Sequence, residues 1–327
     1  MTDALYTGTP TLYAGFSALV AALLLIDFAL LRTQGGQRVS PREAGVWSLV
    51  WVAVAAAFGA WLYAHLASRF GADVARDRTV EYFTGYVIAK GLAVENVFVW
   101  ITIFRYFQVP AEFQKRVLLW GVLGAIVMRA VLIYLGALLI ARFSWVFYVF
   151  GALLLFTGIK MFFVQGKPAD LAQNPALRWM RARLRMTAAL EGERFFVRRD
   201  GVRFATPLLL VLALVELTDL IFALDSIPAI FAVTHDPFIV FTANTFAILG
   251  LRAMYFLLAD MADRFHLLGY GLALIVTLVG AKMLLMDVYK VPIPALLGAV
   301  GVILVGSVVA SLYTRPRAQD GAQRAPA

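Results

Sequence analysis

The order of hydrophobic and polar residues along the chain predicts a series of long apolar helices. Nine mainly apolar stretches are separated by more polar segments, and each is long enough for the ~20 residues that cross a bilayer as a helix. They cover residues 11–31, 46–66, 82–104, 117–140, 145–164, 207–231, 238–258, 267–286 and 293–313. These stretches run too long for barrel strands. We predict an all-α polytopic membrane protein with nine transmembrane helices, the first being a retained span.

Composition narrows the class of protein further. Of 327 residues, 62% are hydrophobic and 15% are charged, whereas a soluble domain has roughly 45–50% and about 25%. The chain has no cysteine, so it can build no disulfide framework, thiolate metal site or cysteine nucleophile. No histidine lies in the interior of a span and no HExxH motif occurs, so we expect no enzyme.

Lys and Arg are unevenly distributed between the loops. With nine spans, 19 of the 29 Lys and Arg residues lie on one side of the predicted membrane and 5 on the other, and the remaining 5 lie inside spans. The positive-inside rule then places the N-terminus outside and the C-terminus in the cytoplasm. This bias explains the net charge of +9 without a nucleic-acid partner.

The longest and most basic loop, 165–206, is expected to be cytoplasmic. Residues 178–185 predict an amphipathic helix lying against anionic headgroups, and residues 194–204 predict a hairpin that turns at Asp200 and Gly201. The tail, 314–327, is rich in Ala, Arg and Pro and is predicted to be disordered.

An internal repeat organises the middle of the chain. Landmarks in residues 82–164 recur in residues 207–286 at a spacing of 121–123 residues, including Gly158-Ile159-Lys160-Met161 as Gly280-Ala281-Lys282-Met283. Each unit contains three spans, so the units have opposite membrane orientation, an architecture typical of transporters. The first two spans (1–81) and the last (287–313) lie outside the repeat. A duplication retained only for packing remains an alternative.

Charged residues inside the spans are the candidates for function. A charge at mid-span costs roughly 2.5–3.5 kcal/mol, so these charges must pair, face water or bind something. The bases recur symmetrically or face the acids, and we expect them to form structural charge pairs: Lys90, Arg129, Lys160, Arg252 and Lys282. Asp27, near the cytoplasmic end of its span, is the weakest candidate among the acids.

The densest acidic cluster lies in the sixth span. Glu216 and Asp219 are three residues apart and therefore share a helix face, within reach of one ion. Asp225 would fall on the opposite face of an unbroken helix. Pro228 is expected to break the helix, which would bring Asp225 back toward the site.

Most polar side chains in the spans offer carboxylate, amide or hydroxyl oxygens as metal ligands. Such oxygen ligands suit Mn²⁺, Mg²⁺ or Ca²⁺. His65, His235 and His266 lie at span ends or in loops, which disfavours Zn²⁺ or Cu⁺. The predicted metal path consists of Glu95, Asn96, Glu216, Asp219, Asp225 and Asn244.

Three segments carry a family resemblance. The run from Val215 to Ile230, with residues 247–255 and 92–100, resembles the TerC family of bacterial membrane proteins, and within it the Alx-like branch. The resemblance implies manganese efflux across the bacterial cytoplasmic membrane, with the intramembrane acids as the ion path. The family usually has Asp-Asn where this chain has Glu95-Asn96, so one extra methylene shifts that carboxylate.

The leading hypothesis is a manganese exporter that alternates access between two inverted units and needs no cofactor. Exchange for protons is open to it, because desolvation raises the pKa of a carboxylate. Two alternatives remain: a membrane partner that helps to metallate or assemble exported proteins, and a lysine-exporter-type amino-acid exporter. Oligomeric state is left open by the sequence.

Overall fold

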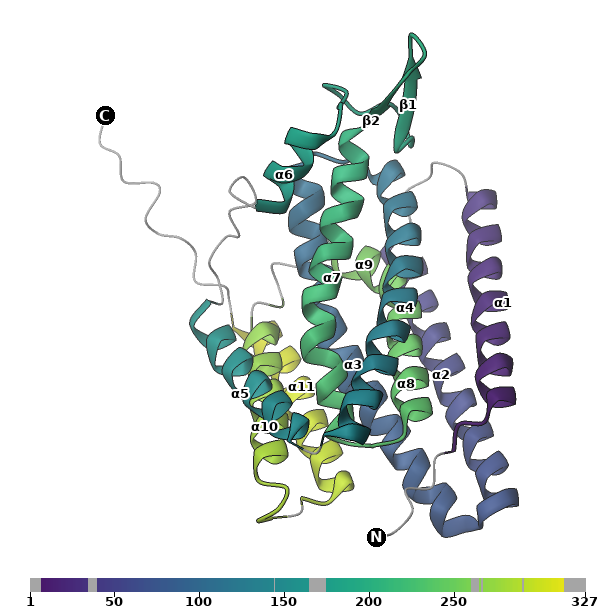
Figure 1. Ribbon diagram of the computed structural model, residues 1–327, viewed down its shortest axis with the longest axis vertical. Coiled ribbons are helices and arrows are strands. Elements are labelled where there is room, and N and C mark those ends of the chain that lie inside the picture. The colour runs from purple at the N-terminus through teal and green to yellow at the C-terminus, as the bar shows by residue number, and fades with distance from the viewer. Residues whose placement is uncertain are drawn as a thin grey trace.

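The computed structural model describes residues 7–34, 40–143, 145–164, 175–259, 265, 267–289 and 291–314. The chain forms a bundle of helices with one small hairpin (Figure 1). The helices are α1 (Pro10–Gln34), α2 (Pro41–Phe70), α3 (Ala72–Tyr106), α4 (Ala111–Arg142), α5 (Val146–Val164), α6 (Pro175–Arg183), α7 (Pro207–Phe231), α8 (Pro237–Leu249), α9 (Leu251–Ala259), α10 (Leu268–Leu284) and α11 (Ile293–Tyr313). The strands are β1 (Phe196–Arg199) and β2 (Val202–Ala205).

Eight candidate membrane spans occur in the described part of the chain, where the sequence predicts nine. The difference is α10, whose 17 residues extend only about 25 Å against a hydrocarbon core of ~30 Å. The predicted seventh span is also divided, because α8 ends at Leu249 and α9 begins at Leu251. The all-α polytopic architecture therefore stands, with one short helix among the predicted spans.

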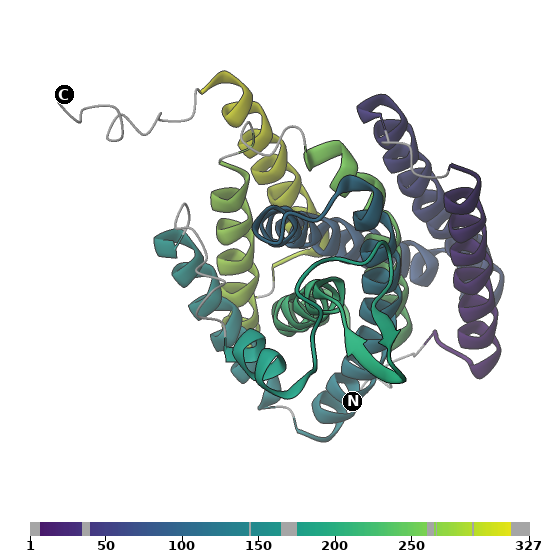
Figure 2. The ribbon, with the colours of Figure 1, turned by 90° about the horizontal axis from the view of Figure 1, so that it is seen from above.

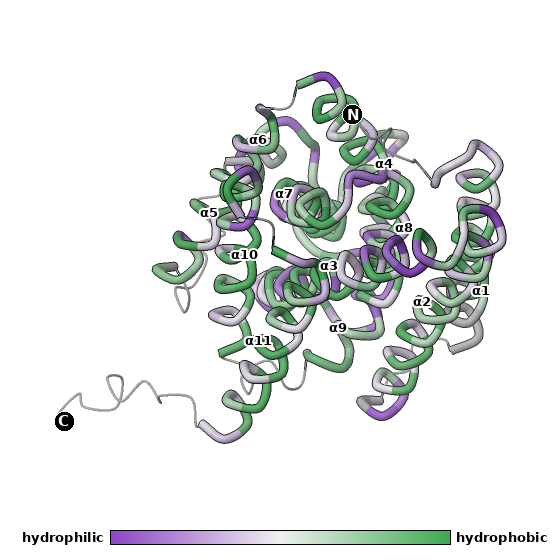
Figure 3. The backbone as a smooth tube through the Cα atoms, turned by 90° about the horizontal axis from the view of Figure 1, so that it is seen from below, coloured by the Kyte–Doolittle hydropathy of each residue, from purple (hydrophilic) through white to green (hydrophobic). Residues whose placement is uncertain are grey.

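The helices differ in how deeply they lie in the bundle (Figure 2). α3 packs against α2, α7 and α8, and the span formed by α8 and α9 is the most enclosed. α1 and α11 lie at the edges and expose most of their apolar side chains. Figure 3 shows hydrophobic residues along most of the length of these helices, as expected for surfaces that face lipid.

The two predicted units pack against each other in a reciprocal way. The first helix of one unit contacts the second helix of the other, since α3 packs on α8 and α4 packs on α7. The third helices, α5 and α10, pack closely together. Gly280 allows this approach, because a Cβ there would lie 2.5 Å from the backbone nitrogen of Leu155.

The basic loop contains the two elements that its pattern predicts. α6 covers residues 178–183 of the expected amphipathic segment, and β1 pairs with β2 in an antiparallel hairpin. Asp200 and Gly201 adopt positive φ angles of 50° and 78°, as a tight hairpin turn requires. The hairpin lies at one end of the bundle (Figure 1). The predicted disordered tail, apart from Thr314, and His266 lie outside the described residues.

Candidate functional site

A buried polar network joins four helices at the centre of the bundle. Asn96 of α3 donates a hydrogen bond from Nδ2 to Asp219 Oδ1 at 2.8 Å. Arg129 of α4 forms an ion pair with the same oxygen at 2.8 Å and reaches Asp219 Oδ2 through Nε at 3.3 Å. Arg129 also donates to Asn244 Oδ1 of α8 at 3.0 Å. Both oxygens of the Asp219 carboxylate are therefore engaged by protein donors.

This network is almost completely desolvated. Asn96, Asp219 and Asn244 are each 1% exposed and Arg129 is 2% exposed. Two of its polar atoms, Asn96 Oδ1 and Asn244 Nδ2, have no hydrogen-bond partner among the described residues. Because an unpaired buried polar atom costs about 1–3 kcal/mol, Asn96 Oδ1 is a candidate for contact with a bound cation or water, and the donor Asn244 Nδ2 for contact with water.

A small cavity lies beside the network, where five helices meet. α3 contributes Glu95 and Asn96, α7 contributes Asp225 and Ser226, and α4 contributes Arg129. Its remaining lining is mainly apolar and comes from α3, α5, α7 and α10: Leu92, Ala93, Met161, Phe222 and Val276. The free volume of about 10 Å³ is close to the minimum that holds one water molecule.

Polar atoms at this cavity form a compact oxygen-rich set. The carboxylates of Glu95 and Asp225 are close enough for their charges to interact. Ser226 Oγ is buried and has no partner in the described part of the chain, as is true of Asn96 Oδ1. Thr157 of α5 hydrogen-bonds to Asp225, and the Lys160 ammonium interacts with the same carboxylate.

Asp225 reaches this cavity without the break that the sequence predicts at Pro228. α7 continues as one helix to Phe231, with Pro228 inside its last turn. The prediction of a broken segment is wrong, because one missing N–H near the helix end removes few hydrogen bonds and Ile230 and Phe231 remain packed in the core. Asp225 lines the same cavity as Asn96 because α5 and α10 close the far side of α7.

Glu216 lies apart from the cavity, although its charge interacts with that of Asp219. Its carboxylate packs against α4 at Gly124, where any Cβ would collide with Glu216 Oε1 and Oε2. No group of three or more His, Asp or Glu residues is arranged to hold a metal ion in the described ranges. The three acids of α7 are thus held at separate positions.

The remaining intramembrane bases have individual partners. Arg252 of α9 forms an ion pair with Asp27 of α1. Lys90 donates to Ala247 O at 3.3 Å, beside the break at Gly250, and Lys282 donates to Ala232 O at 2.6 Å. Sequence reasoning identified these bases but did not assign them to particular partners, because the partners include backbone carbonyls.

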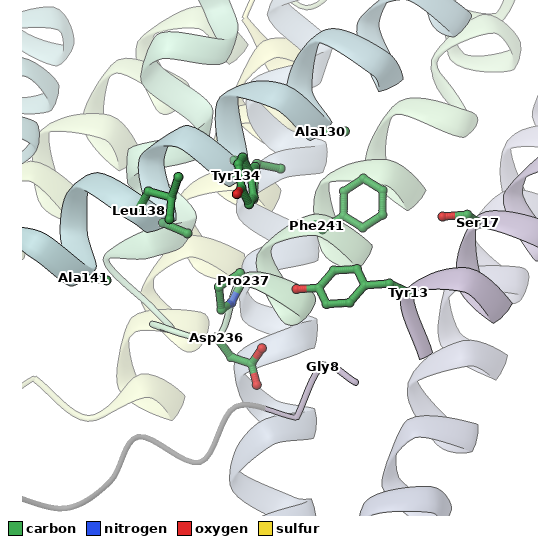
Figure 4. Close-up of a pocket in the computed structure, with 12 residues that line it drawn as sticks. Gly8, Tyr13, Ser17, Ala130, Tyr134, Leu138, Ala141, Asp236, Pro237 and Phe241 are labelled. Carbon is green, nitrogen blue, oxygen red and sulfur yellow. The ribbon is translucent and has the colours of Figure 1, made fainter. Parts of the chain in front are cut away.

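A larger pocket of about 690 Å³ lies elsewhere, between α1, α4 and α8 (Figure 4). Tyr13 and Phe241 face it, and none of the predicted site residues lines it. At its edge Asp236 accepts hydrogen bonds from Thr7 N at 2.7 Å and Thr7 Oγ1 at 2.5 Å. These bonds attach the start of the described chain to the beginning of α8.

Comparison with known proteins establishes the family. The model of the "Integral membrane protein TerC family" matches residues 74–319. The chain belongs to the TerC family. The protein of Shigella flexneri named "Putative membrane-bound redox modulator Alx" is 51% identical over 310 residues, covering 95% of this chain and 97% of its own.

Other TerC relatives cover the chain equally well. The Escherichia coli K12 protein of the same name is 51% identical over 310 residues, again 95% of this chain and 97% of its own. A Myxococcus xanthus membrane protein, STKORF319, is 42% identical over 319 residues, 98% of this chain and 97% of its own. No solved structure matches the chain. The family resemblance seen in the sequence is confirmed, and the chain is an integral multi-pass membrane protein.

Proposed function

We propose that this TerC protein exports Mn²⁺ across the bacterial cytoplasmic membrane. The observation that carries the proposal is the closed cavity, which brings Glu95 and Asp225 together with unpartnered oxygens of Asn96 and Ser226. Two carboxylates neutralise a divalent cation, and carboxylate, amide and hydroxyl oxygens are ligands that Mn²⁺ accepts. The transported ion is the substrate, and no resident cofactor is required.

The buried ion pair assigns different roles to the acids. Arg129 and Asn96 already satisfy Asp219, so this carboxylate holds Arg129 and Asn96 in place rather than carrying the ion in this conformation. Glu216 lies nine residues before Asp225, about 13 Å along α7, and provides a second carboxylate on the path. Asn244 contributes by orienting Arg129.

Alternating access of the two units is the proposed mechanism. The cavity has space for one small particle and lies where α3 of one unit meets α7 of the other, as expected for an occluded site at a repeat interface. Release of a bound divalent cation becomes favourable when a carboxylate takes up a proton, so proton exchange is the proposed driving reaction. The inverted orientation of the units belongs to this proposal.

The relatives' printed name mentions redox modulation. This chain contains no cysteine, so thiol–disulfide exchange on its own side chains is excluded. Export of a redox-active metal ion is compatible with that name, since it would act on cellular redox state without a thiol.

Uptake of Mn²⁺ into inverted membrane vesicles tests the proposal. Wild type should accumulate Mn²⁺ and respond to a pH gradient, Asp225→Asn should lose uptake, and the exposed-site control Asp73→Asn should retain it. Correctly inserted wild type without Mn²⁺ uptake in either condition would contradict the proposal. Lysine uptake indifferent to metal would indicate an amino-acid exporter, and a protein that co-purifies through the loop 165–206 would indicate a metallation partner.

A further inference from the structure

One residue that lines the cavity offers a possible metal ligand other than oxygen. Met161 of α5 lines it together with Glu95, Asn96, Asp225 and Ser226, and it carries the one sulfur atom among the lining residues in the described part of the chain. Met161 is partly buried and packs against the hydrophobic core. The predicted ion path contains only oxygen donors and therefore leaves this thioether without a role.

Oxygen donors alone discriminate poorly between the ions that fit such a site. Carboxylate, carbonyl and water ligands suit Mg²⁺, Ca²⁺ and Mn²⁺ alike. Mg²⁺ and Ca²⁺ are hard cations that take oxygen ligands, and neither gains appreciably from a thioether. Mn²⁺ is a transition-metal ion and begins the series whose members accept nitrogen and sulfur donors with rising affinity.

We propose that the Met161 thioether is a specificity-determining ligand of the transported ion and favours Mn²⁺ over Mg²⁺ and Ca²⁺. This inference rests on the proposed function and refines it at the same site. In the proposed site Glu95 and Asp225 provide the charge, Asn96 and Ser226 complete the oxygen donors, and Met161 supplies the donor that hard cations do not use.

The placement of Met161 follows from the neighbouring residues of its helix. Thr157 and Lys160 of α5 both interact with Asp225, so this face of α5 is held against α7. Met161 lies one turn after Thr157, on the same face of the helix. Asn96, which also lines the cavity, is held by its hydrogen bond to Asp219, the ion-pair partner of Arg129. Met161 therefore belongs to a wall of the cavity that is already positioned by polar contacts.

The internal repeat supplies a matched control. Met283 occupies the equivalent place in the second copy of the motif, at Gly280-Ala281-Lys282-Met283. It is 2% exposed, packs against α5 beside Gly151, and does not line the cavity. Leucine has nearly the volume of methionine and lacks sulfur, so Met161→Leu and Met283→Leu make the same chemical change at a partly buried site and at a buried one.

The test measures Mn²⁺ uptake into inverted vesicles with Mg²⁺ or Ca²⁺ as competitor. Met161→Leu should retain uptake but lose about tenfold in preference for Mn²⁺ over Mg²⁺, since the loss of even an outer contact at a metal site has an effect of about this size. Met161→Gln, which introduces an amide oxygen, should shift the preference further toward Mg²⁺. Met283→Leu should leave the preference unchanged.

Unchanged preference in an active Met161→Leu variant would overturn this inference and leave the proposed function intact. Wild type that transports no Mn²⁺ would overturn both. If Met161→Leu is inserted but inactive, Mn²⁺ bound to the purified protein is measured by electron paramagnetic resonance while Mg²⁺ is added. Displacement at a roughly tenfold lower Mg²⁺ concentration than in wild type supports the inference, and displacement at the same concentration overturns it.

Discussion

At the scale of single residues, the candidate site depends on close contacts between polar side chains and small residues. Asp219 accepts from both Asn96 and Arg129, and Glu216 packs where α4 has only the hydrogen atom of Gly124. Such contacts fix carboxylates in position inside a low-dielectric region, where a free charge would be costly. Changes of one methyl group are therefore expected to alter function before they alter the fold.

Substitution of Gly124 tests this expectation directly. Gly124→Ala should displace the Glu216 carboxylate and reduce Mn²⁺ uptake with little loss of stability, because the atoms that must move are the end of a flexible side chain. The control is Gly298→Ala in α11, where an added Cβ meets no atom within 4 Å. Equal uptake by both variants in inverted vesicles, at equal amounts of inserted protein, would remove Glu216 from the path.

His235, in the loop between α7 and α8, links stability to pH. Burial lowers its pKa below 6.5, and the positive charges of Lys282 and Arg78 lower it further. The ring also packs edge-on against Phe147 of α5, with ring centroids 4.7 Å apart. Since the folded pKa lies below the unfolded one, the unfolded chain binds more protons, and stability is complete above about pH 6.5 and falls as the pH decreases.

The prediction is that replacing His235 flattens this acid dependence. The unfolding temperature of purified protein in detergent should fall between about pH 7 and pH 5, and it should fall less in His235→Gln than in wild type. The carboxylates titrate in both proteins and cancel in the comparison. An equal decrease in both would show that protonation of His235 does not oppose folding.

At the scale of elements, the buried ion pair attaches α4 to α7, and its hydrogen bond to Asn244 extends the link to α8. Removing one partner of a buried pair leaves an uncompensated charge and is expected to cost about 3–5 kcal/mol, whereas removing both costs much less. Arg129→Met should therefore lower the unfolding temperature sharply. Arg129→Met with Asp219→Leu should recover most of the loss.

Size-exclusion chromatography of heated detergent samples measures that difference. The same double variant separates stability from transport, because it restores packing but removes the contacts that fix Asn96. A double variant no more stable than Arg129→Met would show that the contacts to Asn96 and Asn244, rather than the charge balance, hold these helices together.

The apolar pattern predicts elements well where helix length alone decides them. The boundaries of α7 and α11 agree closely with the predicted spans, and the hairpin turns at the predicted Asp200-Gly201 pair. The break at Gly250 was not predicted, and neither was the close packing of Lys90 and Trp51 against this glycine, because both residues come from other helices. Pairing of Arg129 with Asp219 depends on the packing of α4 on α7, which the sequence does not specify by spacing.

At the scale of the whole molecule, α1 is attached to the bundle by the buried side chains of Phe16 and Val20 and by two polar contacts. Thr7 binds Asp236 just before α1, and Asp27 binds Arg252 in the second half of the helix. The large pocket of Figure 4 lies beside the first half of α1. In the repeat Arg252 corresponds to Arg129, but its ion-pair partner is Asp27 of α1. This helix lies outside both units and outside the residues that the family model matches.

The orientation of the whole molecule is open to a direct test, because the chain has no cysteine of its own. Asp200→Cys at the hairpin turn and Asp73→Cys at the start of α3 both replace exposed residues. A membrane-impermeant thiol reagent should label Cys at 200 only in inverted vesicles and Cys at 73 only in intact spheroplasts. The reverse pattern would invert the orientation, and labelling of both from one side would change the number of spans.

The ion pair between Arg129 and Asp219 also has a consequence for biosynthesis. The two residues are 90 positions apart, so at 5–20 residues per second α4 leaves the ribosome roughly 5–20 s before its counter-ion exists. During that interval an unpaired guanidinium must be held at the insertion machinery or drawn toward the membrane surface. Synthesis of α7 then supplies the carboxylate that allows α4 to settle at full depth. Insertion of the first unit is in this way completed by translation of the second.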